Sequence, residues 1–225
     1  MKKILTAILL LMISTTIGFA QNGPEPYYGF RLGLAAHPTI GWVKPETGKS
    51  NGVNLGFSYG LLADFNFAEN YSFSTGLTIT TINGKSTEIN PSPYYDATAY
   101  PNATAYDLKY MLQYVEIPLT VKLKTEKIGD VRWYGQFGLS NDFNIGARQD
   151  VRVEGRLIAD DIAARKNINF YRAGLIVGAG VEYDIARNTS FTTGLTFNNG
   201  FTDISDDKNR KVRNHYLGIN FGVFF

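Results

Sequence analysis

Apolar and polar residues alternate with a period of two along most of the chain. From Val53 to Phe67 every odd position is apolar, and the even positions are polar or glycine except for Leu62. The last residues repeat this pattern, with large apolar side chains at every odd position from Leu217 to Phe225. Successive side chains of a strand point to opposite faces, so this period predicts strands and not helices.

The alternation predicts eight strands, several of them longer than the average soluble strand of about five or six residues. They cover residues 27–42, 53–67, 71–84, 107–124, 131–149, 166–185, 188–202 and 212–225. A strand tilted by about 45° needs about 9–11 residues to cross the hydrocarbon of a bilayer. The predicted strands are long enough to do so.

The two faces of these strands differ in a way that indicates a membrane. One face carries large apolar side chains, and the other is rich in Gly, Ser, Thr and Asn, which suit a narrow lumen. Lipid offers no hydrogen-bonding partner to a free strand edge, so the sheet must close. The sequence therefore predicts an all-β protein, a closed eight-stranded antiparallel transmembrane β-barrel.

The predicted connections alternate between short and long. Residues 68–70, 125–130 and 186–187 form short turns, and residues 43–52, 85–106, 150–165 and 203–211 form longer loops. Outer-membrane barrels have short periplasmic turns and longer external loops. We therefore expect both chain ends on the periplasmic side.

The first residues are typical of a secretory signal peptide. Lys2 and Lys3 precede an apolar run, and Gly18-Phe19-Ala20 places small residues where a signal peptidase cleaves. We expect residues 1–20 to be removed and residues 21–225 to form the barrel in the outer membrane. The alternative, an uncleaved anchor, requires a longer apolar run of about 20 residues.

Composition narrows the chemistry further. The chain has no cysteine, which excludes a disulfide scaffold, a thiolate metal site and a cysteine nucleophile. Its formal net charge of +2 gives no support for nucleic-acid binding. We expect no cofactor and no metal.

The run from Gln113 to Lys124, Gln-Tyr-Val-Glu-Ile-Pro-Leu-Thr-Val-Lys-Leu-Lys, resembles the PorT-like outer-membrane β-barrel family, as do Gly174–Tyr183 and the terminal Phe225. The resemblance implies insertion by the outer-membrane assembly machinery, with Phe225 as part of the recognised end. PorT itself is associated with type IX secretion and gliding, which implies an accessory secretion role as one alternative. Pro118 lies mid-strand within this run and predicts a β-bulge.

Eight charged residues fall on the predicted inward face: Arg31, Asp64, Glu116, Lys122, Arg132, Asp142, Glu182 and Asp184. The interior of an eight-stranded barrel is about wide enough to be filled by side chains. Isolated burial of a charge is costly, so these residues must pair or contact water. We expect a structural ion-pair network that fills the lumen, with a gated conductance path as the alternative.

The chain contains two histidines, His37 and His215. They fall on the first and last predicted strands, which are neighbours in a closed barrel, so the two side chains could approach each other. Some small outer-membrane barrels resemble lipid A acyl-modifying enzymes, and those enzymes use His with Ser and a carboxylate. In this chain no Ser lies clearly beside either histidine. We expect no enzymatic activity, and a lipid-modifying enzyme remains the alternative.

The loop 85–106 is the best candidate for a binding surface because it is rich in proline and tyrosine, including Tyr94, Tyr95, Tyr100 and Tyr106. The alternative is a packed cap over the barrel mouth.

We expect a structural or interaction protein of the cell envelope. The expected partners are outer-membrane lipid and lipopolysaccharide, the assembly machinery, and a secretion-system or envelope protein.

Overall fold

The computed structural model describes residues 29–225 except residues 95, 97, 101, 187 and 209, so the expected signal peptide lies outside the described residues. The strands are β1 Gly29–Pro45, β2 Gly48–Ala68, β3 Tyr71–Ile89, β4 Ala105–Lys124, β5 Val131–Val153, β6 Arg156–Ala163, β7 Tyr171–Ala186, β8 Thr189–Gly200 and β9 Val212–Phe224. One short 3₁₀ helix, η1, covers Arg165–Asn167. No helix in the described part of the chain is long and apolar enough to cross a membrane.

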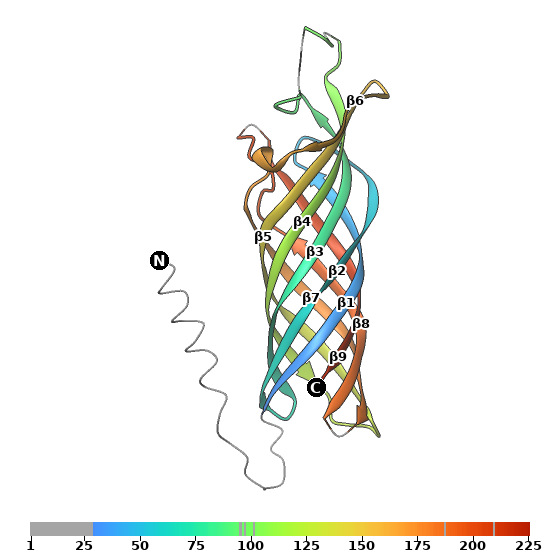
Figure 1. Ribbon diagram of the computed structural model, residues 1–225, viewed down its shortest axis with the longest axis vertical. Helices are drawn as coiled ribbons and strands as arrows, with labels where there is room; N and C mark the ends of the chain where they lie inside the picture. The colour runs from blue at the N-terminus through green and yellow to red at the C-terminus, as the bar shows by residue number, and fades with distance from the viewer. Residues whose placement is uncertain (1–28, 95, 97, 101, 187, 209) are drawn as a thin grey trace, which may run out of the picture.

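Eight long strands form a closed antiparallel ring (Figure 1). Each of them pairs with the next long strand in the chain, and β9 returns to pair with β1. The seam extends to the last residue, since the N–H groups of Leu32 and Phe225 each donate to the other residue's carbonyl. The predicted eight-stranded closed barrel is confirmed.

The two ends of the barrel differ. We call the end with the short connections 69–70, 125–130 and 187–188 the turn end; the C-terminus lies there (Figure 1). We call the opposite end, where β6 and the longer connections lie, the loop end. β1 to β5 reach further toward the loop end than predicted, whereas β7 begins at Tyr171 and β8 ends at Gly200, short of the predicted residues 166 and 202. Only residues 46–47 join β1 to β2, and the predicted loop 150–165 contains the end of β5 and the additional strand β6.

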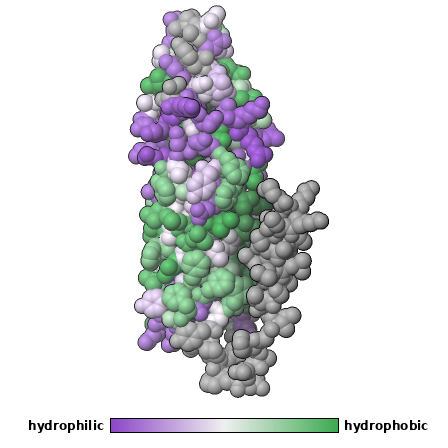
Figure 2. Space-filling view, turned by 90° about the vertical axis from the view of Figure 1, so that its left-hand side faces the viewer, coloured by the Kyte–Doolittle hydropathy of each residue, from purple (hydrophilic) through white to green (hydrophobic). Residues whose placement is uncertain are grey.

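Figure 2 shows a broad apolar band over the part of the barrel nearer the turn end. Its side chains point outward and remain exposed, for example Leu55 at 74%, Phe65 at 45% and Leu195 at 53%. Water would penalise such a continuous apolar surface, whereas acyl chains accept it. This band is the membrane-spanning segment.

Beyond the band the strands exchange the character of their two faces. The outward positions become polar, as at Lys85, Thr87, Lys109 and Asp150, and Figure 2 shows the hydrophilic region that results. The inward positions form an apolar core, each at most 2% exposed: Val43, Ile82, Tyr106, Leu108, Tyr110, Leu112, Tyr114, Val151, Val153, Ile204, Val212 and Tyr216. Outside the membrane the apolar side chains must face inward, as in a soluble barrel. We call this cluster the upper core.

A bulge in β5 makes this exchange possible there. The pairing shifts between Gln113 and Tyr114 of β4, which lie opposite Gly146 and Asn144. Before the shift the even-numbered residues of β5 point inward, and after it odd-numbered residues such as Val151 do. The bulge predicted at Pro118 is wrong, because Pro118 pairs with Ser140 without a register shift. Between β3 and β4 the ladder lacks the pairs around Pro118, but the register is the same before and after the gap. The missing N–H of the proline is therefore accommodated without an extra residue.

Candidate functional site

A cluster of five charged side chains closes the lumen at the turn end. Arg31 Nη1 lies 2.6 Å from Glu182 Oε1, and Arg31 Nη2 lies 3.3 Å from Asp64 Oδ2. Lys122 Nζ lies 2.8 Å from the same Asp64 oxygen, and Lys124 Nζ lies 3.3 Å from Glu182 Oε2. Both carboxylates are almost fully buried, so each depends on its cations to offset the loss of hydration. We call these residues the lower cluster.

The inward ring of Phe224 completes the lower cluster. Its centroid lies 5.2 Å from the Arg31 guanidinium carbon and 4.9 Å from Lys122 Nζ, distances suited to cation–π attraction. Gly33 makes room for the ring, since a Cβ there would approach Phe224 to 2.7 Å. The lower cluster is therefore packed as well as charge-paired.

Arg172 of β7 is the centre of a second buried cluster. Its Nη1 donates to Asp142, its Nε donates to Asn214 Oδ1 at 2.5 Å, and its Nη2 donates to Asn198 Oδ1 at 2.9 Å. Arg172 and Asp142 are both 0% exposed. Gly200 leaves space for the guanidinium, because a Cβ there would lie 2.7 Å from Arg172 Nη2. We call this group the Arg172 cluster.

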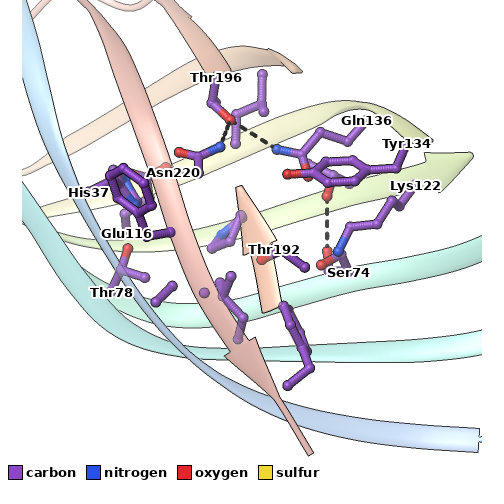
Figure 3. Close-up of a pocket in the computed structure, with 18 of the residues that line it drawn as sticks. His37, Ser74, Thr78, Glu116, Lys122, Tyr134, Gln136, Thr192, Thr196 and Asn220 are labelled. Carbon is purple, nitrogen blue, oxygen red and sulfur yellow. Dashed lines mark hydrogen bonds between the residues drawn. The ribbon is translucent and has the colours of Figure 1, made fainter. Parts of the chain in front are cut away.

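Glu116 is the ladder partner of Asp142, beside the Arg172 cluster, and is held by a tyrosine. The Tyr216 hydroxyl lies 2.9 and 3.0 Å from the two Glu116 oxygens. Beside it is a cavity of about 70 Å³. Figure 3 shows His37 and Glu116 on one side of this cavity, and Lys122 and Tyr134 on the other. The space suits a few water molecules and is too small for a drug-sized ligand.

The predicted lumen residues thus divide among several places. Arg31, Asp64, Lys122 and Glu182 meet in the lower cluster, and Asp142 belongs to the Arg172 cluster. Glu116 bonds to Tyr216. The two remaining residues lie at the turn end, where Asp184 Oδ2 is 2.7 Å from Lys127 Nζ and Arg132 is the ladder partner of Glu182.

Sequence reasoning missed Lys124, Arg172, and the pair of Glu88 and Arg210. Lys124 and Arg172 share the inward parity of Lys122 and Gly174, so the same alternation could have identified them. Glu88 had no such signal, because β3 was expected to end at residue 84.

Arg210 holds the external connections onto the barrel mouth. Its Nη1 donates to the buried carboxylate of Glu88, and its Nη2 donates to the carbonyl of Ser92 at 3.2 Å. Its Nε lies 3.1 Å from Asp207 Oδ2. Tyr110 also donates to Glu88, with 2.6 Å between oxygens. One side chain therefore joins the end of β3 to the connections 90–104 and 201–211, which we call the external cap.

The tyrosines expected to form an external binding surface are largely part of this cap. Tyr94 donates to Gln149 Oε1 at 2.5 Å, and burial raises the pKa of its phenol. Tyr100 packs against the upper core. Tyr106 is wrong as a surface residue, because β4 begins before it and points it into the upper core at 0% exposure. Tyr95 lies outside the described residues.

The exposed positions among the described residues of the connection 90–104 are small or polar instead: Asn90, Ser92, Pro93, Asp96, Thr98, Ala99, Asn102 and Thr104. Backbone N–H groups of Ala99 and Thr98 donate to Asp96 and hold the pKa of its carboxyl below the usual value. These bonds order the tip of the connection.

The two histidines do not form a shared site. His37 points into the lumen beside the cavity, whereas His215 points outward and lies 5.6 Å from the Trp42 ring. The expected approach of the two side chains is therefore wrong, because their parities place them on opposite faces of the wall. Among the described residues no group of three or more His, Asp or Glu side chains could hold a metal ion.

Comparison with solved structures finds other outer-membrane barrels. Neisserial surface protein A is 18% identical over 87% of this chain and 95% of its own, with a TM-score of 0.47. OprG from Pseudomonas aeruginosa is 12% identical over 89% and 99%, also with a TM-score of 0.47. The outer membrane protease OmpT from Escherichia coli is 11% identical over 93% and 98%, with a TM-score of 0.38.

No curated protein matches the chain. The model of the outer membrane protein beta-barrel domain matches residues 19–206, which is most of the sequence. Together with the closed ring and its apolar band, this match assigns the protein to the outer membrane. The chain belongs to the outer membrane protein beta-barrel domain family.

Proposed function

We propose that this protein is a non-conducting, non-enzymatic barrel that serves the cell envelope as a structural and interaction protein. The observation that carries the proposal is the upper core, which fills the part of the barrel that extends beyond the membrane. A filled barrel end makes a rigid support, and the external cap lies over it. The cap and the β5–β6 hairpin are the surfaces offered to a partner.

The same observation favours this function over a pore. An ion crossing the barrel would have to pass the lower cluster, the Arg172 cluster and then the upper core. Leu108, Leu112 and Val151 in that core are at most 1% exposed and offer no polar atoms. Moving a charge through such surroundings is very costly.

We expect the purified protein to give no conductance steps in planar bilayers, at neutral pH and at voltages that leave the bilayer intact. A general porin in the same chamber serves as the positive control. Reproducible steps from the folded wild-type barrel would contradict the proposal and favour the pore.

A photo-crosslinking side chain at Thr98 of the cap or at Arg156 of the β5–β6 hairpin tests the interaction role in intact cells. Both positions are exposed. We expect a discrete protein adduct from at least one of them, and none from Phe137, which lies in the apolar band and is 52% exposed. Absence of adducts from both external positions would count against a protein partner.

The PorT-like resemblance remains a prediction, and the identity of the adduct bears on it. A secretion-system component would favour the accessory role, which also predicts periplasmic accumulation of cargo on deletion. A lipid-modifying activity has less support, since His37 and His215 lie on opposite faces of the barrel wall.

A further inference from the structure

Two pairs of basic residues lie directly opposite each other on the outer surface, beyond the apolar band. Lys44 of β1 is the ladder partner of Arg213 of β9, and Lys85 of β3 is the ladder partner of Lys109 of β4. Like charges at directly opposite positions destabilise a sheet. An anion nearby would relieve the repulsion within each pair.

The second pair has its anion within the protein. Asp150 of β5 lies opposite Lys109 in the ladder, and its Oδ2 is 3.0 Å from Lys109 Nζ. The repulsion between Lys85 and Lys109 is thereby reduced. This pair serves as an internal comparison for the first one.

The first pair has no such partner among the described residues. Lys44 and Arg213 are both exposed, and neither forms an ion pair with a described residue. Asp203 is close in the fold, but its Oδ1 accepts hydrogen bonds from the backbone N–H groups of Ser205 and Val212. Glu46 follows in the turn and donates its backbone N–H to the carbonyl of Lys211, but its carboxylate forms no ion pair with Lys44 or Arg213.

An aromatic and apolar surface begins directly below the first pair. Trp42 and His215 are the next outward ladder partners toward the membrane, and Ile40 and Leu217 follow them. The Trp42 ring stacks on Phe197 at 5.9 Å between centroids and 8° between planes. Tryptophan prefers the headgroup zone of a bilayer, so the cations above it are at the depth of lipid headgroups.

We propose that Lys44 and Arg213 bind the phosphate of a phosphorylated glycolipid of the outer leaflet, of the lipid A type. The acyl chains then lie along Ile40 and Leu217, and Trp42 contacts the lipid between headgroup and chain. Charge complementarity and the continuous apolar surface below the cations select this occupant. The proposal depends on the outer-membrane location and not on the interaction role proposed above.

The binding test uses the barrel refolded into a neutral detergent, free of native lipid. The chain has two tryptophans, so W133F leaves Trp42 as the only tryptophan reporter. Titration with lipid A is followed by the fluorescence of Trp42. We expect K44Q/R213Q to weaken binding about 30-fold, at about a factor of five for each basic residue near a lipid surface. The control K85Q should change binding by less than about twofold, because Lys85 belongs to the other pair.

Two further ligands identify the source of the anion. Dephosphorylated lipid A should bind the wild type as weakly as lipid A binds K44Q/R213Q. Inorganic phosphate alone should not perturb Trp42 at the concentrations that saturate with lipid A. The proposal is overturned by unchanged binding in K44Q/R213Q, by equal binding of the dephosphorylated lipid, or by saturation with inorganic phosphate alone.

Thermal stability gives a second readout whose sign depends on the lipid. In neutral detergent, K44Q/R213Q should unfold at a higher temperature than the wild type, because the repulsion is removed. In bilayers that contain lipid A it should unfold at a lower temperature, because the bound phosphate is lost. The same sign in both environments would contradict the proposal.

Discussion

Arg172→Leu is expected to destabilise the folded barrel by about 3–5 kcal/mol, the usual cost of removing one partner of a buried ion pair. The reason is that Asp142, at 0% exposure, would keep its charge without its cation. Asn198 and Asn214 would also lose the guanidinium to which their side-chain oxygens are bonded. The folded fraction against denaturant concentration in lipid vesicles measures the effect.

Arg148→Leu is the matched control. Arg148 forms an ion pair with Asp161, but both side chains are more than half exposed, at 62% and 51%. Exposed pairs contribute about 0–1 kcal/mol, so this variant should unfold close to the wild type. A second variant, Arg172→Gln with Asp142→Asn, removes both charges of the ion pair together and should lose less stability than Arg172→Leu. Equal loss in the three variants would show that burial of the ion pair is not the cause.

The alternation of residues predicted the fold because lipid imposes it on every spanning strand. In β2 and β9 the apolar parity remains outward over the whole membrane band, so the sequence alone defined strand, face and closure. At the loop end, β1 to β5 were predicted too short because the rule applies only inside the membrane. At Val43 and Val151 the apolar residues take the inward parity, and a reading based on lipid contact interprets such positions as loops.

The lumen was less predictable than the wall. Parity alone places Asp64 and Asp142 inside, but it does not say which cation reaches each of them. Arg31 meets Glu182 because the ring closes between β1 and β9 and brings sequence-distant strands across a narrow lumen. Tyr106 was assigned to the surface because proline and tyrosine in a long connection suggested exposure, whereas the inward parity of β4 extends through it.

The external cap depends on contacts of the same kind, made by residues far apart in the sequence. Glu88 is 1% exposed and accepts hydrogen bonds from Ser86, Tyr110 and Arg210. Among the described residues of the cap, only Arg210 brings a positive charge to it. Because Arg210 also binds the Ser92 carbonyl, its loss would release the connection 90–104 as well as the connection 201–211.

Arg210→Leu is therefore expected to open the external cap without unfolding the barrel. Removing one partner of a buried ion pair costs about 3–5 kcal/mol. The population of molecules with an open cap, and with it the cleavage rate, should therefore rise by at least about 100-fold. Chymotrypsin added to intact cells measures this as cleavage after Tyr94, and it needs no cut at Arg210 itself.

Glu88→Gln separates the charge from the shape of this contact. The amide can still bond to Ser86 and Tyr110, and Arg210 can still reach Ser92 and Asp207, so cleavage should rise less than in Arg210→Leu. The double variant E88Q/R210L should be cleaved more slowly than Arg210→Leu alone, because no buried carboxylate is then left without its cation. Arg156→Leu, an exposed change on the β5–β6 hairpin, should leave cleavage at the wild-type rate. If Arg210→Leu is as resistant as the wild type, the upper core alone holds the cap in place, and the bonds of Arg210 do not.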